Sequence, residues 1–187
     1  MLPVTIDDTS LILVHGSVVD QEVDAIVNAA NKTMRGGGGI DGVIHRAAGE
    51  MMLRELQEVA PSGARTGQVV VTHGHDLPQP FVFHVAGPRW QDGRHQEPLL
   101  LEECYNNCLA EADQRELTSI AFCSISTGIY GFPIDRASSI AVESVIAYLR
   151  DHPETKLDRV VFAMYGVEEY KQFETALTSP ADGTSGR

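Results

Sequence analysis

Basic residues are scarce in this chain of 187 residues, which has 14 lysines and arginines against 26 aspartates and glutamates and a formal net charge of −12. Proteins that hold nucleic acid or anionic membranes nonspecifically use clustered lysines and arginines. The deficit therefore argues against a membrane partner and against extended nucleic acid. It leaves room for a single bound diphosphate, because backbone N–H groups at a glycine loop supply local positive potential whatever the overall charge.

Cysteine clusters and long apolar runs are also missing. The three cysteines, Cys104, Cys108 and Cys123, are odd in number and are expected to be reduced thiols. No Cys/His cluster has the spacing of a structural zinc site, so no metal is expected. No apolar run approaches the roughly 18 residues of a membrane helix, and the first ten residues do not resemble a signal peptide. These features predict a cytoplasmic protein.

Short β-branched runs alternate with longer stretches that repeat apolar residues every three or four positions. The expected strands are Leu11 to His15, Asp24 to Asn28, Val69 to His73, Phe81 to Val85, Ser119 to Ser124 and Arg159 to Tyr165. The expected helices are Ile40 to Glu58, Leu99 to Arg115, Asp135 to Arg150 and Glu168 to Leu177. Strands joined by crossover helices predict the α/β class: a three-layer α/β/α sandwich with a mixed, mostly parallel central sheet.

The length suits a single domain, placed at residues 1–178. The tail from Ser179 to Arg187 is predicted to be disordered. In open α/β sheets, ligands bind outside the carboxyl ends of the strands. Three distinctive loops follow predicted strands, at residues 28–39, 87–97 and 124–133. These loops are therefore the expected binding edge.

The segment from Asp24 to Gly49 runs from a predicted buried strand through four consecutive glycines, Gly36 to Gly39, into an amphipathic helix. Glycine has no Cβ, so the backbone N–H groups can approach a phosphate or a ribose closely. The N-terminus of the helix directs its partial positive charge at the same place. Asn28, Asn31 and Asp41 flank the glycines with short polar side chains, which suit orienting a sugar and polarising a water.

This segment, DAIVNAANKTMRGGGGIDGVIHRAAG, closely resembles the macrodomain family, and within it the MacroD-like branch that binds and hydrolyses ADP-ribose adducts. The likeness continues at residues 83–90 (FHVAGPRW), 124–133 (SISTGIYGFP) and 160–170 (VVFAMYGVEEY). Together with residues 16–19, these blocks span nearly all of the chain before the tail, in the order that the family shows. The resemblance implies the macrodomain fold.

The resemblance also implies roles for particular residues. Asn31 is expected to hydrogen-bond the distal ribose, and Asp41 to position or activate the attacking water. Tyr165 matches the aromatic position that stacks on adenine, and the backbone of residues 126–130 matches the part that holds the phosphates. The ligand-binding residues expected in this way are Ser17, Val18, Asn28, Gly38, Gly39, Ile40, Ser126, Thr127, Gly128, Ile129, Tyr130, Phe132 and Tyr165.

Simpler structural roles stay open for several of these residues. Asp41 can be read as the N-cap of the helix, and Asn28 as a partner for loop backbone groups. Phe132 can be a packing residue rather than a neighbour of the distal ribose, and an isolated aromatic such as Tyr165 is often a core residue. The residues expected to be mainly structural are His45, Arg46 and Trp90.

One block departs from the family pattern. Family members usually carry Gly-Asp-Ile-Thr after the first long strand, and the Asp accepts a hydrogen bond from the adenine amino group. Residues 16–19 here are Gly-Ser-Val-Val. A hydrogen bond to a charged group contributes about 1.5–3 kcal/mol, against about 1 kcal/mol for a neutral one. Ser17 therefore predicts weaker adenine selectivity or a shifted base.

The resemblance implies a hydrolase that removes mono-ADP-ribose from acidic protein side chains and deacetylates O-acetyl-ADP-ribose without a metal or other cofactor. Its expected partners are ADP-ribose and mono-ADP-ribosylated proteins, and it is expected to be a monomer. The rivals are a reader that binds ADP-ribose without turnover, and a hydrolase of ADP-ribose 1″-phosphate or of ADP-ribosylated nucleic acid. A Rossmann-type dinucleotide enzyme fits worst, because the glycines lack G-x-G-x-x-G spacing.

Overall fold

The structure is a computed structural model that describes residues 3–179. Within that range the chain forms seven strands and five α-helices. The strands are β1 (Val4–Ile6), β2 (Thr9–His15), β3 (Ala25–Ala30), β4 (Val69–His73), β5 (Phe81–Ala86), β6 (Ser119–Phe122) and β7 (Arg159–Met164). The helices are α1 (Gly39–Ala48), α2 (Glu50–Val59), α3 (Glu97–Gln114), α4 (Ile134–Asp151) and α5 (Val167–Thr178), with a 3-10 turn, η1, at Val18–Asp20.

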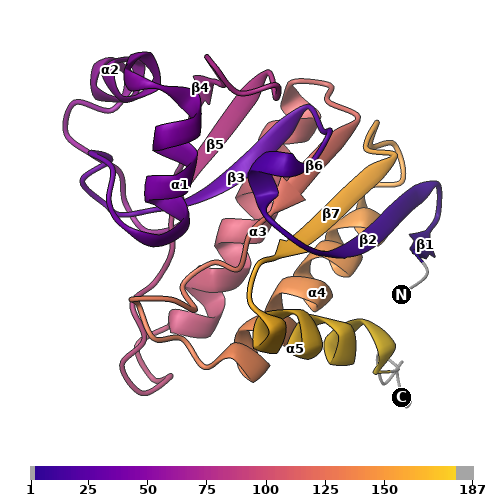
Figure 1. Cartoon of the computed structure of the whole chain (residues 1–187). Coiled ribbons are helices and arrows are strands. Elements are labelled where there is room, and N and C mark those ends of the chain that lie inside the picture. Colours follow the sequence, from indigo (N-terminus) through magenta and orange to yellow (C-terminus); the bar gives the residue numbers. More distant parts are fainter. Residues whose placement is uncertain (1–2, 180–187) are drawn as a thin grey trace.

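The strands form one sheet in the order β1-β2-β7-β6-β3-β5-β4. The five central strands are parallel, and the edge strands β1 and β4 run antiparallel to their neighbours. The carboxyl ends of β2, β7, β6, β3 and β5 therefore share one edge of the sheet (Figure 1). This is the α/β architecture that the alternation of strand and helix patterns predicts.

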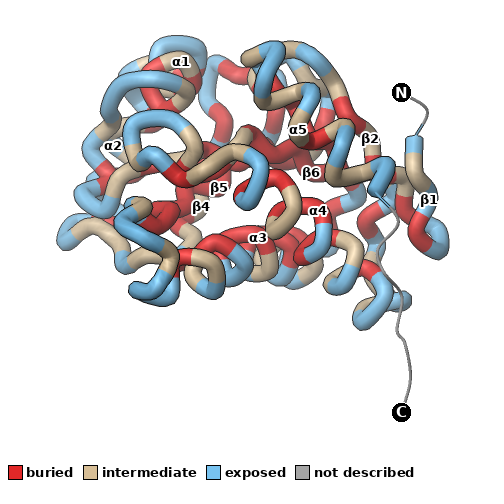
Figure 2. The backbone as a smooth tube through the Cα atoms, turned by 90° about the horizontal axis from the view of Figure 1, so that it is seen from below, coloured by how far each residue is buried: buried red, intermediate tan, exposed pale blue. Residues whose placement is uncertain are grey.

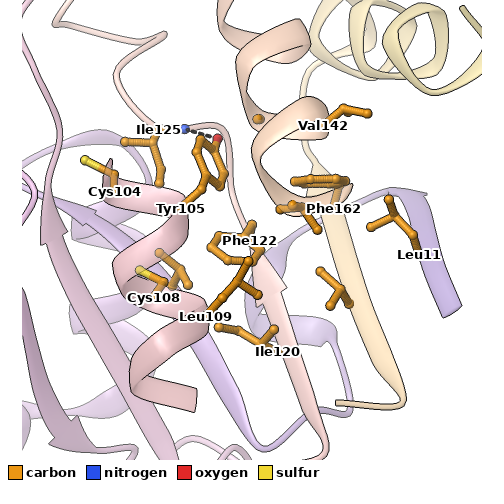
Figure 3. Close-up of a cluster of buried hydrophobic side chains, with 14 of the residues drawn as sticks. Leu11, Cys104, Tyr105, Cys108, Leu109, Ile120, Phe122, Ile125, Val142 and Phe162 are labelled. Atoms are coloured by element: carbon orange, nitrogen blue, oxygen red, sulfur yellow. Dashed lines mark hydrogen bonds between the residues drawn. The ribbon is translucent and has the colours of Figure 1, made fainter. Parts of the chain in front are cut away.

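Apolar residues on the two faces of the sheet build three separate clusters, of which the two largest cover one face each. One face packs against α3, α4 and α5 through a cluster that includes Tyr105, Phe122 and Phe162 (Figure 3). The other face packs Ile26 and Val82 against Ile44 of α1. Figure 2 shows buried residues concentrated in the strands and on the inner sides of the helices. Helices on both faces bury the sheet and leave its carboxyl edge for loops.

The first predicted helix, Ile40 to Glu58, is wrong as a single element. The chain breaks it into α1 and α2 at Gly49, which has φ 80° and ends α1. The positive φ favours glycine here, and a Cβ at Gly49 would also lie 2.5 Å from Asp76 Oδ2, so that the Asp76 side chain would have to move. The three-residue edge strand β1 is too short to give a period and was not predicted.

The remaining predicted elements lie within two residues of their observed ends at each terminus, and β4 matches its predicted bounds of Val69 to His73. The three cysteines are buried and unpaired. No helix in residues 3–179 has the length and apolar character needed to cross a membrane. The predicted disordered tail lies outside the described residues except for Ser179.

Candidate functional site

A cavity of about 870 Å³ opens at the carboxyl edge of the sheet. It lies between two loops: the glycine loop, residues 31–38, which joins β3 to α1, and the serine loop, residues 123–133, which joins β6 to α4. The predicted site residues in its wall are Ser17, Val18, Asn31, Gly38, Gly39, Ile40, Asp41, Ser126, Thr127, Gly128, Ile129, Tyr130 and Tyr165. Asn28 and Phe132 are buried behind the wall rather than in it.

Asn31 is tied to the glycine loop that it begins. Its Nδ2 donates to the carbonyl of Gly36 at 2.9 Å, and its Oδ1 accepts from the backbone N–H of Thr33 at 3.1 Å. Gly37 passes so close that a Cβ there would lie 3.3 Å from Asn31 Nδ2 and 3.0 Å from Asp41 Oδ2. The absence of a side chain at Gly37 lets the loop backbone pass close to both polar groups.

Asp41 sits in the first turn of α1 and is only 4% exposed. The N-cap of α1 is Gly38, and no side chain caps the helix, so Asp41 is not its N-cap. Asp41 Oδ1 instead accepts a hydrogen bond from Asn28 Nδ2 at 2.7 Å. His45 Nε2 lies 3.3 Å from the same oxygen without making a hydrogen bond. Among residues 3–179 no hydrogen bond reaches Oδ2, which leaves that oxygen for a water.

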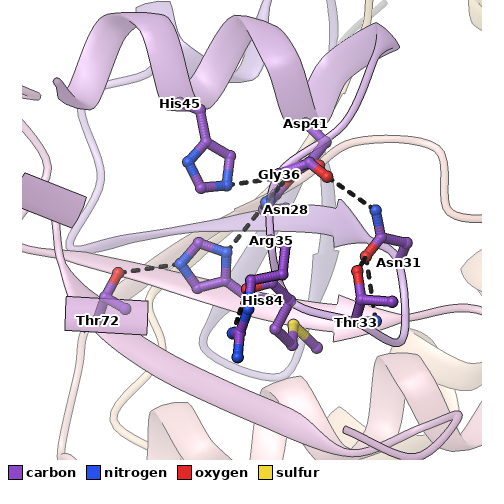
Figure 4. A network of polar contacts seen from close by, with 10 residues as sticks. Asn28, Asn31, Thr33, Arg35, Gly36, Asp41, His45, Thr72 and His84 are labelled. Carbon is purple, nitrogen blue, oxygen red and sulfur yellow. Dashed lines mark hydrogen bonds and ion pairs between the residues drawn. The ribbon is translucent and has the colours of Figure 1, made fainter. Parts of the chain in front are cut away.

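Behind Asp41 lies a chain of buried polar side chains from three neighbouring strands (Figure 4). Asn28 Nδ2 contacts His84 Nδ1 at 3.0 Å as well as Asp41, and His84 Nε2 contacts Thr72 Oγ1 at 2.9 Å. Asn28, His84 and Thr72 are each at most 1% exposed. Burial, and to a lesser extent the neighbouring His45, lowers the pKa of His84 from 6.5 to about 3, so the ring is neutral at pH 7.

His84 and Thr72 are functional candidates that sequence analysis missed. A single histidine inside the apolar run of β5 was the available signal, since a buried polar side chain requires a partner. Its partner could not be named because the two contacts of the ring depend on how β3, β4 and β5 are paired. His45, expected to be structural, also reaches Asp41.

The serine loop holds its shape through backbone bonds and aromatic packing. Ser126 has φ 68°, and its carbonyl accepts the N–H of Phe132 at 3.0 Å. The Phe132 and Trp90 rings lie 4.6 Å apart, and the N–H of Trp90 donates to the carbonyl of Tyr130 at 2.9 Å. Phe132 is thus buried behind the loop and packs against Trp90 there, while its predicted place beside the distal ribose stays a prediction.

Glu97, at the start of α3, organises the segment that follows Trp90. Its carboxylate accepts N–H groups from Gln91, Asp92, Gly93 and His95. Burial opposes its charge, but these backbone donors and its own N–H prevail and lower the pKa of Glu97 to about 2. The Asp92, His95 and Glu97 atoms that could bind a metal lie within 4.8 Å of one another. Both Glu97 oxygens already accept backbone hydrogen bonds, so we interpret this group as one that fixes the segment rather than as a metal site.

The far end of the cavity is open and partly apolar. Tyr165 and Ile129 are 79% and 80% exposed at its rim. Ser17 lines the wall near them, and so does Glu169, which sequence analysis did not single out. Glu169 Oε2 accepts the N–H of Gly166 at 3.2 Å, and Oε1 lies 3.4 Å from Thr127 Oγ1. The cavity thus offers backbone-rich loops at its centre, a buried carboxylate at one end and an exposed aromatic ring at the other.

Comparisons with known proteins agree on one family. The Macro domain profile matches residues 27–141. The chain is 40% identical over 173 residues to a Macro domain-containing protein of Chlorobaculum tepidum, covering 92% of this chain and 98% of that one. It is also 41% identical over 169 residues to one of Listeria monocytogenes, covering 89% and 96%.

Two solved structures have similar folds. One is the Oceanobacillus iheyensis macrodomain with ADP, with a TM-score of 0.89, 36% identity and 94% of each chain covered. The other is the Trypanosoma brucei macrodomain in complex with ADP-ribose, with a TM-score of 0.83 and 40% identity, covering 89% of this chain and 68% of that chain.

Proposed function

The chain belongs to the Macro domain family, and from this premise we propose that it binds ADP-ribose and hydrolyses ADP-ribose adducts. The substrates are mono-ADP-ribose on acidic protein side chains and O-acetyl-ADP-ribose. The observation that carries the hydrolase assignment is the buried Asp41 carboxylate, which has one oxygen held by Asn28 and the other free at the cavity wall.

Binding is supported by the shape and chemistry of the cavity. Its volume of about 870 Å³ lies in the range of small-molecule sites. The glycine loop leads into the N-terminus of α1 and the serine loop into that of α4, and helix N-termini favour phosphate. The two macrodomains described above hold ADP and ADP-ribose. A diphosphate between the two loops would place the adenine toward Tyr165 and the distal ribose toward Asn31 and Asp41.

In the proposed reaction a water sits between Asp41 Oδ2 and a phosphate of the bound ligand. The water attacks C1″ of the distal ribose, or the ester carbon, while Asn31 fixes the ribose. Its proton passes either to Asp41 or to the ligand phosphate. When C1″ is attacked, the side-chain carboxylate leaves as an anion and the proton taken from the water passes on to solvent; when the ester carbon is attacked, the ribose alkoxide that leaves takes up that proton. General acid–base assistance of this kind typically contributes a factor of about 10²–10⁴ in rate.

The test is release of ADP-ribose from a glutamate-linked mono-ADP-ribosylated protein, with ADP-ribose binding followed by calorimetry. Asp41→Ala and Asn31→Ala should each lower kcat by about 10²–10⁴ while binding survives. Asp151→Ala, at an exposed acid at the end of α4, is the matched control and should behave as the unaltered protein. Turnover that persists in Asp41→Ala would contradict the proposed role of that carboxylate.

The rival functions give different outcomes in the same assay. Binding without turnover on both protein-linked and acetylated ADP-ribose would make the protein a reader. Turnover only on ADP-ribose 1″-phosphate, or on an ADP-ribosylated nucleic-acid end, would assign a different substrate class to the same catalytic site. Neither binding nor turnover would mean that Ser17 has changed the nucleotide preference altogether.

A further inference from the structure

We propose that His84 is a positioning residue: through Asn28 it fixes the hydrogen bond that holds Asp41 in place for the attacking water. This inference rests on the proposed function of Asp41. It concerns side chains that lie buried behind the cavity wall. The chain of contacts runs from Thr72 to His84, to Asn28 and to Asp41, with every link between 2.7 and 3.0 Å.

The direction of each hydrogen bond follows from the carboxylate. An ionised carboxylate accepts hydrogen bonds only, so the Asn28 atom 2.7 Å from Asp41 must be the donor nitrogen Nδ2. The same nitrogen lies 3.0 Å from His84 Nδ1, which must therefore accept its second proton. His84 then carries its own proton on Nε2 and donates it to Thr72 Oγ1. One tautomer of His84 satisfies the whole chain.

The other tautomer would break it. A proton on His84 Nδ1 would face the Asn28 amino group, so that the amide would have to rotate and present Oδ1 instead. That oxygen would then meet the Asp41 carboxylate, and two acceptors at this separation repel each other. Asn28 Oδ1 has no partner among the described residues, so no other contact holds the amide in its present orientation. His84 with its proton on Nε2 therefore requires the same Asn28 atom that Asp41 requires, and the two contacts together hold the amide in place.

The sheet places these side chains together. Asn28 of β3 and His84 of β5 are direct register partners, so they project from the same face at the same level. Thr72 of β4 reaches the far nitrogen of the ring from the next strand. The ring is fully buried, and Asp41, His45 and Glu55 are the titratable groups whose charges act on it. Because His84 stays neutral at pH 7, Nδ1 keeps its acceptor lone pair there.

The experiment compares two substitutions of similar shape, His84→Asn and His84→Leu. Asparagine can place Oδ1 close to the former Nδ1 and accept from Asn28, whereas leucine cannot. We expect kcat for glutamate-linked substrate to fall by about 10- to 100-fold in His84→Leu, as a small misplacement of a reacting group does. His84→Asn should stay close to the unaltered protein, and the Kd for ADP should change in neither.

Equal losses of kcat in the two variants, or no loss in either, would overturn the proposal. So would a loss in His84→Leu that appears as a parallel rise in KM and in the Kd for ADP, because that pattern reports collapse of the pocket rather than misplacement of Asp41. If both variants fail to fold, Thr72→Val takes their place. It keeps the ring and removes the acceptor of Nε2–H, so a smaller drop in kcat is expected, and unchanged kcat would contradict the inference.

A second measurement separates this inference from the proposed function. Nitrogen-15 NMR of the histidine rings shows which nitrogen of His84 carries the proton, whether or not the protein turns over substrate. A proton on Nε2, together with slow exchange of the Asn28 amino protons that His84→Leu accelerates, supports the positioning role. A proton on Nδ1 overturns it. Absence of turnover with the Nε2 tautomer present would reject the hydrolase and leave the hydrogen-bond chain intact.

Discussion

The glycine loop and the serine loop face each other across the same cavity, but different interactions hold them. Behind the glycine loop lies a chain of buried polar side chains that ends on Asp41. Behind the serine loop lie two aromatic rings, Phe132 and Trp90, with Arg136 over the Trp90 ring at 4.9 Å. Hydrogen bonds specify the orientation of one carboxylate, whereas packing specifies the position of a stretch of backbone.

The difference fits what each loop would present in the proposed function. A reacting carboxylate has to be aimed within a fraction of an ångström, and only directional bonds to its oxygens do that. Backbone N–H groups that hold a phosphate need a fixed path for the chain, which apolar packing supplies. We call the buried polar chain behind the glycine loop the polar side of the cavity, and the two rings behind the serine loop the aromatic side. We therefore expect substitutions on the polar side to lower kcat, and substitutions on the aromatic side to lower stability and ligand affinity.

The largest expected effect comes from Phe132→Ala on the aromatic side. Phe132 is 2% exposed, and removal of a buried phenyl ring typically lowers the free energy of unfolding by about 3–5 kcal/mol. Urea denaturation measures the loss, and calorimetry should show a higher Kd for ADP because the serine loop loses its support. Phe132→Leu should lose less of both. An unchanged free energy of unfolding would mean that the ring does not support the loop.

On the polar side, His84 should make stability depend on pH. Its pKa is about 3 in the folded protein and near 6.5 when unfolded. Between these values the unfolded chain binds a proton that the folded chain does not, so the free energy of unfolding falls as pH drops from 6.5 toward 3. One proton gives a slope of about 1.4 kcal/mol per pH unit. Above pH 6.5 this contribution is complete and constant.

Denaturation at several pH values tests this slope. His84→Asn should remove the slope of about 1.4 kcal/mol per pH unit that one proton gives to the free energy of unfolding between pH 6.5 and 3. His15→Asn removes an exposed histidine and should leave that slope nearly unchanged. A curve of equal slope in His84→Asn would show that the ring is not buried and neutral as the structure has it.

The contrast between the loops also explains what the sequence could predict. Asn31 and Asp41 flank the glycines in the chain, so their grouping is visible in the sequence, and the structure places both in the cavity wall. His84 lies 56 residues from Asn28 and meets it only through the pairing of β3 with β5. Strand register is set by the whole sheet, so a local pattern does not reveal such a partner.

Packing roles were equally hard to assign in advance. A phenylalanine between glycine and proline, as at Phe132, has the same local pattern whether it faces a ligand or the core. In the structure Phe132 is 2% exposed and packs against Trp90, whereas Tyr165 is 79% exposed at the rim of the cavity. The break at Gly49 was missed because the apolar period continues across it, so the periodicity does not show the positive φ that ends α1 there.

A smaller effect on the Kd for ADP is expected from Glu97→Gln. This substitution tests whether the aromatic side of the cavity also depends on the charge of Glu97. The folded pKa of Glu97 is about 2, below its ordinary 4.5, so its contribution to stability is present above pH 4.5 and is lost as pH falls toward 2. Loss of the charge should loosen the segment after Trp90. Because Trp90 is the only tryptophan in the sequence, its fluorescence reports on this segment alone. Its emission should shift to the red at pH 7, and the Kd for ADP should rise.

The control for this change is Glu102→Gln, at an exposed acid on the same helix α3. It should leave the Trp90 emission and the Kd for ADP unchanged. Identical emission spectra for Glu97→Gln and the unaltered protein would show that neutral acceptors are enough to hold the segment, and the aromatic side would then rest on packing alone.

The smallest effect on stability should come from Tyr165→Ala, which sharpens the contrast with Phe132. Because Tyr165 is 79% exposed, the free energy of unfolding should change by less than about 0.5 kcal/mol. Stacking of a base on an aromatic side chain is worth about 1–3 kcal/mol, so the Kd for ADP should rise by about 5- to 150-fold in calorimetry. Tyr165→Phe keeps the ring and should bind ADP as the unaltered protein does. Equal weakening in both variants would assign the contact to the hydroxyl group, and no weakening in Tyr165→Ala would place the adenine elsewhere, as Ser17 allows.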